Sequence, residues 1–398
     1  MARGEGDAVQ CLSDSPQNPE PGTQNPAVTP LRRILVVKLA GIGDLLTAFP
    51  AMEALRKCHP EAEISALVTP ATAPMLEGAG LVDRVIVLDK YLFDDAGGFL
   101  NPRALTGLWA LAARLRAMHF DAAILLHHMV FWSGVVKYGF LMPATAARFR
   151  VGLDDGRARF LNLSVRDRGF GGRHEVEYWL EVVGLLGAID PQPVVVRVRW
   201  GDAEDSYADE AWGGLGLAAT DRVVAIHPGS GSYSPVRRWS PRGFAAVADS
   251  LASVGLKPLV VAGPDEEDLA ASVLAAARCR PLLLKAVPGP LHLAAILSRC
   301  RLFVGNDSGV TQIAFAAGVP VVALFGPSNR WAWAPYDPAG ERSRVVSLDL
   351  GCSPCLYVGQ SLGLRNGCGN PLCMLQITPD AVVAAAKELM AATESRPQ

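Results

Sequence analysis

The residues best suited to chemistry lie in three short loops, and the first of these loops contains Asp44. This carboxylate follows Gly41 and Gly43, two glycines that let a backbone turn tightly and approach a ligand. Asp44 has two interpretations. It could cap the helix that starts here, an effect worth about 1 kcal/mol, or it could act as a general base on a hydroxyl. The loop alone favours the cap.

A dinucleotide-binding loop is a weaker interpretation of the same segment. That motif needs a third glycine three residues after Gly43, where the chain has Leu46. It also needs an acid near the end of the second strand, but Val68 is followed by Thr69 and a proline. We therefore expect a ligand other than a nicotinamide dinucleotide, and we predict no cofactor.

The second and third loops suit an anion. Ser230 lies among small residues that expose backbone amides, and Arg237 and Arg238 follow closely. Hydroxyls, amides and guanidinium groups together suit a diphosphate, whereas the simpler alternative is a solvated surface loop. Asp307 and Ser308 open a further helix, whose N-terminus favours a phosphate and whose first residues also suit a cap.

These loops follow apolar runs that alternate with helical patterns in two series. The first series starts at residues 34–37 and the second at residues 223–226. Such alternation is typical of parallel sheets with helices on both faces, so we predict an α/β fold of two doubly wound, Rossmann-like domains facing a cleft. The expected segments are a disordered N-terminal tail (1–30), a first domain (31–205), a linker region (201–220) and a second domain (206–390).

The composition excludes several classes of protein. The 398 residues include 37 Lys plus Arg and 39 Asp plus Glu, for a net charge of −2. Without a basic field, a dedicated nucleic-acid binder is excluded. The first thirty residues lack the basic start and apolar run of a secretory signal, and the longest apolar stretches are interrupted by polar residues and prolines. We predict a cytoplasmic protein.

Five motifs in the correct order resemble the heptosyltransferase family, glycosyltransferase family 9. Each motif alone is weak, but the ordered set is specific, and the match runs from about residue 32 to residue 390. The motifs are Lys38–Asp44, His227–Ser230, Arg238–Ser240, Gly263–Asp265, and Asn306–Gly309 continuing to Gly326–Ser328.

The resemblance implies a two-domain GT-B fold and an inverting, metal-independent transfer of a sugar from a nucleotide diphosphate sugar. In the family, the donor is typically ADP-heptose, and the acceptor is a growing lipopolysaccharide core at the cytoplasmic face of the inner membrane. It therefore implies a role in lipopolysaccharide biosynthesis. The first domain would lie on the acceptor side, the second would bind the nucleotide sugar, and the protein could contact the membrane peripherally.

The resemblance also implies roles for individual residues. Asp44 would be the catalytic base, on a loop that includes the substrate-binding residue Gly43. Ser230 and Arg238 fall where donor phosphate contacts occur, with Arg237 beside them to stabilise the departing diphosphate. The remaining substrate-binding positions are Asp265, which would contact the nucleotide, and Asp307, Ser308 and Gly309, which would hold the sugar and the diphosphate.

One position departs from the family pattern. Members usually carry a histidine three residues beyond the glycine of the last loop, where this chain has Gln312. A neutral amide cannot carry the charge that an imidazole can, so donor identity and activity are open at this point. Two alternatives to transfer therefore stay open: a sugar-nucleotide epimerase on the same fold, or a sugar-nucleotide-binding protein without turnover.

A basic segment lies in the first half of the chain. Seven arginines and three aspartates lie between Arg148 and Arg173. The segment is either a solvated surface or a patch for an anionic acceptor or for lipid headgroups.

A cysteine group lies near the C-terminus of the chain. In a reducing compartment, such a group could hold a structural Zn²⁺, or it could provide free thiols or a redox pair. Its members are Cys352, Cys355, Cys368 and Cys373.

Overall fold

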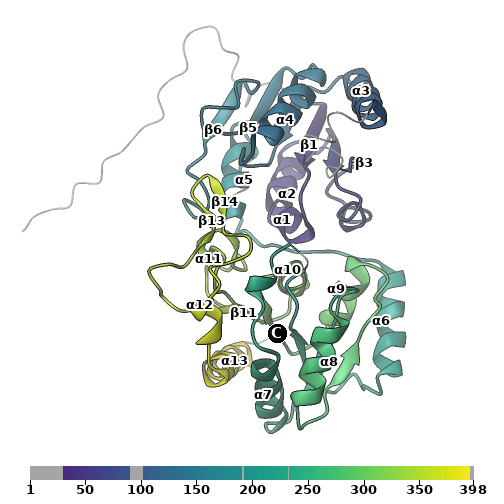
Figure 1. Cartoon of the computed structure of the whole chain (residues 1–398). Helices are drawn as coiled ribbons and strands as arrows, with labels where there is room; N and C mark the ends of the chain where they lie inside the picture. Colours follow the sequence, from purple (N-terminus) through teal and green to yellow (C-terminus); the bar gives the residue numbers. More distant parts are fainter. Residues whose placement is uncertain (1–29, 90–101, 191, 232, 395–398) are drawn as a thin grey trace, which may run out of the picture.

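The computed structural model describes residues 30–89, 102–190, 192–231 and 233–394. The tail predicted at 1–30 therefore lies, apart from its last residue, outside the described residues. Two six-stranded parallel sheets with helices packed around them form two halves of the molecule (Figure 1). This arrangement confirms the predicted α/β fold with two doubly wound sheets.

The first half contains a sheet with the strand order β3-β2-β1-β4-β5-β6. Its inner strands are short aliphatic runs that are buried on both faces, as expected for parallel strands covered by helices. The strands are β1 (Arg33–Lys38), β2 (Glu63–Val68), β3 (Arg84–Val87), β4 (Ala122–Leu125), β5 (Phe149–Asp154) and β6 (Leu163–Arg166). The helices are α1 (Ile42–Leu46), α2 (Phe49–Cys58), α3 (Pro102–Ala117), α4 (Trp132–Ala144) and α5 (Glu175–Gly184).

The second half repeats this plan with the strand order β12-β11-β10-β7-β8-β9. Its strands are β7 (Val223–His227), β8 (Lys257–Val261), β9 (Leu282–Leu284), β10 (Leu302–Asn306), β11 (Val321–Leu324) and β12 (Ser343–Val346). The longer helices are α6 (Asp202–Gly214), α7 (Pro241–Ala252), α8 (Glu267–Ala276), α9 (Pro290–Leu297), α10 (Gly309–Ala316) and α13 (Pro379–Glu394), with the short helices α11 (Arg330–Trp333) and α12 (Leu372–Leu375).

Both sheets reverse their strand order next to the strand that opens them. β1 lies between β2 and β4, and β7 lies between β8 and β10. Ligands of doubly wound sheets bind outside the carboxyl ends of the strands at such switch points. The three predicted loops follow β1, β7 and β10, so the topology brings each of them to a switch point.

The halves are joined through a continuous apolar core. The largest cluster of buried apolar residues contains side chains of both sheets, such as Leu45 and Leu46 from α1 and Ile313 and Phe315 from α10. Helices α1 and α10 contact each other directly where the halves meet (Figure 1). None of the helices in the described segments is long and apolar enough to cross a bilayer.

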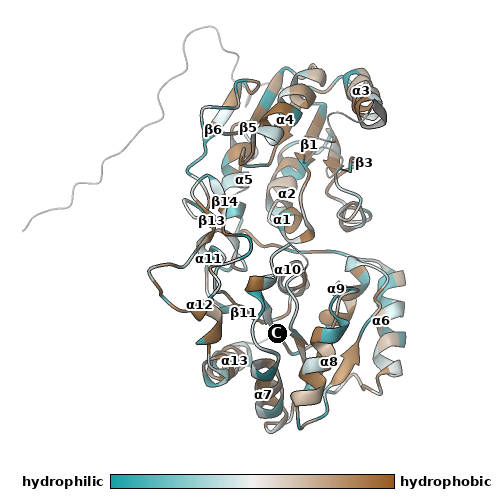
Figure 2. Cartoon of the chain, viewed as in Figure 1, coloured by the Kyte–Doolittle hydropathy of each residue, from teal (hydrophilic) through white to brown (hydrophobic). Residues whose placement is uncertain are grey.

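The linker predicted over residues 201–220 is wrong, because most of this segment is helix α6. The Gly201 amide donates a hydrogen bond to Glu204 at 2.9 Å and starts the helix, and Ala208 and Trp212 bury one narrow stripe. The other positions are largely exposed, and Figure 2 shows α6 as mostly hydrophilic. Only two deeply buried positions, followed by two glycines, give a weak helical signal.

Helix α6 also runs through the expected boundary between residues 205 and 206. It packs on α9 of the second half. We therefore propose that the two halves divide before Gly201 rather than inside this helix.

A hairpin of the second half docks on the first half. It consists of β13 (Leu356–Val358) and β14 (Ser361–Gly363). The Phe170 amide, in the segment after β6, donates to the Gly359 oxygen at 2.8 Å. Asn329 holds the same place from the side, because its Nδ2 donates to the oxygens of Phe170 and Tyr357 at 3.2 and 2.9 Å. The backbones meet so closely that a Cβ on Gly169 would lie 2.6 Å from the Gly359 carbonyl carbon.

We predict that Gly169→Ala destabilises the protein more than the same substitution at a left-handed glycine that has no close neighbours. Gly169 has φ +79°, and Gly216 has φ +70° with no atom within 4 Å of an added Cβ. Both alanine variants lose about 1–2 kcal/mol from backbone strain, but only Gly169→Ala adds a clash worth about 1–3 kcal/mol more. Urea denaturation of the two variants measures the difference, and equal losses would contradict the docking.

Candidate active site

The starts of α1 and α10 approach each other closely. A Cβ on Gly43 would lie 3.3 Å from Gln312 Cγ and 3.5 Å from the Gly309 Cα. An added methyl group would therefore press on the Gln312 side chain and would be in van der Waals contact with the backbone of α10. Because each helix follows a strand at the switch point of its sheet, this contact brings the carboxyl edges of the two sheets together.

Asp44 lies in the first turn of α1 and is half-buried. Its Oδ2 accepts a hydrogen bond from the Gly41 amide at 3.1 Å. Gly41 is therefore the N-cap residue, and Asp44 binds back to it from the third position of the helix instead of being the N-cap that the sequence suggests. The charge of this carboxylate acts on the second half of the molecule. Burial and then the negative charge of Asp44 raise the pKa of the Tyr357 phenol above its usual range. Tyr357 comes from the docked hairpin, which therefore faces Asp44.

Arg237 joins the loops that follow β7 and β10. Its Nη1 donates to the backbone oxygen and to Oδ2 of Asp307 at 3.0 and 3.2 Å, and its Nη2 donates to the Ser230 oxygen at 2.7 Å. Burial by itself lowers the pKa of the guanidinium, but Asp307, Tyr357 and Asp44 outweigh it and raise the pKa. These bonds are made within the protein, so Arg237 positions the two loops.

Ser230 and Arg238 differ in what they offer to a ligand. Ser230 is buried, and its hydroxyl donates to the Ser234 oxygen at 3.1 Å. Arg238 is half-buried and donates to the Gly231 oxygen at 3.1 Å through Nη2, while its Nε has no partner in the described part of the chain. Of the two neighbouring arginines, Arg237 and Arg238, it is therefore Arg238 whose guanidinium has an N–H group without a protein partner.

Ser308 caps α10, as the sequence predicts. Its Oγ accepts a hydrogen bond from the Thr311 amide at 3.2 Å. Asp307 precedes this cap and is held by Arg237, so the first turn of α10 starts in a fixed position. A helix N-terminus carries about half a positive charge from its unsatisfied amides. The start of α10 therefore carries a partial positive charge at this edge of the second sheet.

Glu266 is a buried group of this site that the sequence motifs do not indicate. It pairs with His227 Nε2 at 2.9 Å and accepts from the amides of Gly231 and Gly263 at 3.0 and 3.2 Å. Burial opposes its charge, but these donors outweigh burial and lower the pKa to about 2. A Cβ on Gly229 would collide with its carboxylate. Glu266 thus fixes the loop that contains Ser230.

Asp265, the acid that the sequence motif indicates, is exposed and does not take part in the hydrogen bonds that Glu266 makes. Its neighbour Glu266 points inward because it starts α8 at the end of a buried strand. The sequence signal that could have indicated Glu266 is a pair of glycines, Gly231 after β7 and Gly263 after β8. Their backbone amides lie at the same edge of the sheet, and each needs a hydrogen-bond acceptor. The predicted residues that meet near the contact of the two halves are Gly43, Asp44, Arg237, Asp307, Ser308 and Gly309.

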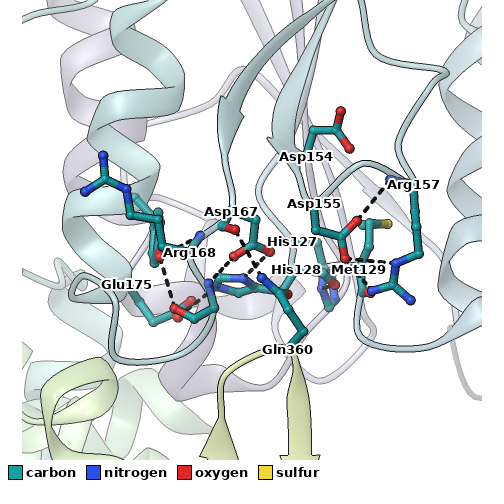
Figure 3. A network of polar contacts seen from close by, with 12 residues as sticks. His127, His128, Met129, Asp154, Asp155, Arg157, Asp167, Arg168, Glu175 and Gln360 are labelled. Carbon is teal, nitrogen blue, oxygen red and sulfur yellow. Dashed lines mark hydrogen bonds and ion pairs between the residues drawn. The ribbon is translucent and has the colours of Figure 1, made fainter.

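A second buried polar cluster lies at the carboxyl ends of β4 and β6 (Figure 3). His128 is 5% exposed and bridges two carboxylates, with Nδ1 2.8 Å from Asp167 Oδ2 and Nε2 3.0 Å from Glu175 Oε1. Burial by itself disfavours the imidazolium, but the two carboxylates outweigh it and raise the pKa of His128 to about 9. His128 is therefore a buried cation at neutral pH, and it ties α5 to the segment after β6.

We predict that this cluster makes stability depend on pH in a defined range. A histidine whose folded pKa is raised contributes stability that is fully present below about pH 6.5 and is lost as the pH rises through about 9. The loss is on the order of 3 kcal/mol. Glu175→Gln removes one of the two charges that raise the pKa of His128. The protein therefore loses less stability between about pH 6.5 and 9 than the wild type does. Urea denaturation at pH 6, 7, 8 and 9 tests this, and parallel curves for both proteins would contradict it.

The described cysteines are free thiols. Cys373 is buried, whereas Cys352 and Cys368 are exposed. Within the described segments, no three His, Cys, Asp or Glu side chains are arranged to hold a metal ion. The alternative of a structural zinc site at the cysteine group is therefore not supported.

Two facing, doubly wound sheets with charged loops at their meeting edges are the architecture of GT-B glycosyltransferases. A family model described as glycosyltransferase family 9 (heptosyltransferase) matches residues 108–364. The chain belongs to this family and is a glycosyltransferase.

Individual proteins show the same relationship. Lipopolysaccharide heptosyltransferase 3 of Escherichia coli (strain K12) is 26% identical over 309 residues, which are 74% of this chain and 82% of that protein. The crystal structure of a glycosyltransferase family 9 protein from Veillonella parvula has a TM-score of 0.72 at 25% identity and covers 90% of this chain and 97% of that chain. The structure of E. coli ADP-heptose lps heptosyltransferase II has a TM-score of 0.67 at 20% identity, covers 91% of this chain and 100% of that one, and shows the shared fold.

Proposed function

We propose that this glycosyltransferase moves a heptose from ADP-heptose to a sugar of a lipopolysaccharide core, with inversion at the anomeric carbon. The family and the relatives named lipopolysaccharide heptosyltransferases support this substrate pair. The observation that carries the proposal is the position of Asp44. Asp44 lies in the first turn of α1, next to Gly43, whose position against the start of α10 brings it to the meeting edge of the two halves.

The reaction is a single displacement. Asp44 takes the proton from an acceptor hydroxyl, whose oxygen attacks the anomeric carbon. The new glycosidic bond forms as the bond from the anomeric carbon to the diphosphate oxygen breaks, and ADP leaves with the electron pair. Inversion requires the base and the leaving group on opposite sides of the sugar, which agrees with Asp44 in one half and the positive groups in the other.

The charge that develops on the diphosphate needs stabilisation. We assign this role to the amides at the start of α10 and to the guanidinium of Arg238, with Arg237 and Asp307 holding the loops in place. Because Gly43 and Gly309 have no side chains, the edge of the second sheet that would bind the donor sugar can come close to Asp44. Because these groups supply positive charge, the proposed step needs no metal ion. Ser230 acts through its loop rather than through its hydroxyl, since that hydroxyl donates to the Ser234 oxygen.

Gln312 fits a structural role at this site. Its Nε2 donates to the Trp333 oxygen at 2.7 Å, and its Cγ lies against Gly43. The amide therefore links α10 to α11 beside the contact of the two halves. This position is compatible with an active site that has glutamine in place of histidine.

We predict that Asp44→Asn abolishes most of the transfer and leaves the fold unchanged. The side-chain oxygen of asparagine can still accept a hydrogen bond from the Gly41 amide, but asparagine cannot take a proton. Loss of a general base costs about 10²- to 10⁴-fold in rate. ADP release from ADP-heptose with a lipopolysaccharide-core acceptor measures the effect, and calorimetry measures retained donor binding.

The control for this experiment is the unfolding midpoint of the same variant. If Asp44→Asn turns over like the wild type, Asp44 is a cap and the proposed base is wrong. Acceptor-independent conversion of the sugar nucleotide by the wild type would instead identify an epimerase. The predicted cytoplasmic location and the contact with the inner membrane remain predictions, which fractionation of cells producing the protein would test.

A further inference from the structure

A cavity of about 390 Å³ lies where the chain passes from the first half to the second. Its volume falls within the range of about 300–1,000 Å³ that is usual for small-molecule sites, which often lie between domains. Helix α2, residues 80–81, Leu180 of α5 and the segment 192–199 line it. This segment leads from α5 to α6 between the two halves (Figure 1). We call residues 192–199 the crossover segment and the cavity the crossover pocket.

The crossover segment presents two arginines to the pocket on the same side. Val196 and Val198 are buried in the main apolar core, whereas Arg197 and Arg199 are exposed and line the pocket. Such alternation is typical of an extended chain, in which residues two apart point to the same side. Their Cα atoms are then about 6.6 Å apart. Both guanidinium groups therefore reach the same space.

The pocket has an excess of positive charge. Four cationic side chains line it against two carboxylates: Arg56, Lys57, Arg197 and Arg199 against Glu53 and Asp190. Lys57 compensates for both carboxylates in part, because its Nζ pairs with Asp190 at 2.5 Å and Glu53 lies one turn earlier in α2. Arg56 pairs with Asp83 at 2.5 Å. Arg197 and Arg199 form no ion pair with any residue that the structure describes, so their charge is available to a ligand.

A further arginine indicates that the charge of Arg197 is not neutralised within the protein. Arg342 donates to the Phe315 oxygen at 2.5 Å through Nη2, and its Nε has no partner among the described residues. Burial and the charge of Arg197 lower the pKa of this guanidinium, and Asp337 only partly opposes them. An anion bound to Arg197 would reduce this repulsion.

The crossover pocket is remote from Asp44. The Nη1 of Arg56 donates to the Ala62 oxygen at 2.9 Å, immediately before the first residue of β2. This is the amino edge of the first sheet, whereas Asp44 lies beyond the carboxyl end of β1. The six-residue strands between these edges span about 17 Å. An anion in the pocket is therefore not the diphosphate that leaves in the proposed transfer.

We propose that the crossover pocket binds a diphosphate group, with Arg197 and Arg199 each donating to one of its two phosphates. Guanidinium groups match phosphate oxygens in forked geometry, and two of them on one side of an extended chain suit two linked phosphates. Pro50, Leu81 and Val195 add apolar surface, which suits an organic group attached to the diphosphate. This inference goes beyond the proposed function, because the site takes no part in the transfer.

The test is calorimetric titration of the full chain with inorganic pyrophosphate. It compares the wild type with the double variants Arg197→Ala/Arg199→Ala and Arg114→Ala/Arg116→Ala. The second variant is the matched control, because it loses two exposed arginines at the same spacing from helix α3, where residues two apart point to different sides. Urea denaturation checks that both variants fold.

We expect the wild type and the matched control to bind pyrophosphate at a site for which Arg197→Ala/Arg199→Ala has at least about tenfold lower affinity. Equal binding by all three proteins would overturn the proposal. Equal losses in both double variants would also overturn it, because total charge would then explain the binding. Inorganic phosphate or sulfate bound as tightly as pyrophosphate would overturn the assignment of a diphosphate.

Titration with ADP distinguishes two sources of the diphosphate. If the wild type binds two ADP molecules and Arg197→Ala/Arg199→Ala binds one, a nucleotide supplies the group. If both proteins bind ADP at the same number of sites while the pyrophosphate site depends on Arg197 and Arg199, the ligand is the inorganic anion. Both results support the crossover pocket, and neither depends on whether the protein transfers heptose.

Discussion

The contact between α1 and α10 sets the geometry of the candidate active site. Each helix begins at the switch point of its own sheet, and the two starts meet at Gly43 and Gly309, where no side chain intervenes. The carboxyl edges of the two sheets therefore face each other at one place. Asp44 on one side and the α10 N-terminus with Arg237 on the other depend on this approach for their relative position. An added Cβ at Gly43 would act on both at once.

Charged groups at these edges divide into two kinds. Glu266, His128 and Arg237 are surrounded by protein partners, and their altered pKa values reflect hydrogen bonds that hold loops in place. Removing one partner from such a network leaves the others buried and unpaired, which is costly. Asp44 and Arg238 are only half-buried. We assign chemistry to this second kind and positioning to the first.

The sequence predicted the parts of the structure that follow from local pattern. Apolar runs ended by glycines located β1 and β7, and the Ser308 cap follows from residue type and position. Helix α6 was missed because it buries only a narrow stripe. The bridge through His128 and the docked hairpin could not be predicted, because each depends on partners that are distant in sequence. The resemblance points to Asp265, which is exposed, and its role in binding the nucleotide stays a prediction.

The hairpin of β13 and β14 carries Tyr357 on one strand and Gln360 in its turn, and both reach the first half from this single element. Surface hairpins usually tolerate insertions and deletions. Here a one-residue insertion in the turn would shift the pairing of Phe170 with Gly359 and move Gln360 away from Asp167. The length of this hairpin is therefore fixed by its contacts with the first half, although much of its surface is exposed to solvent.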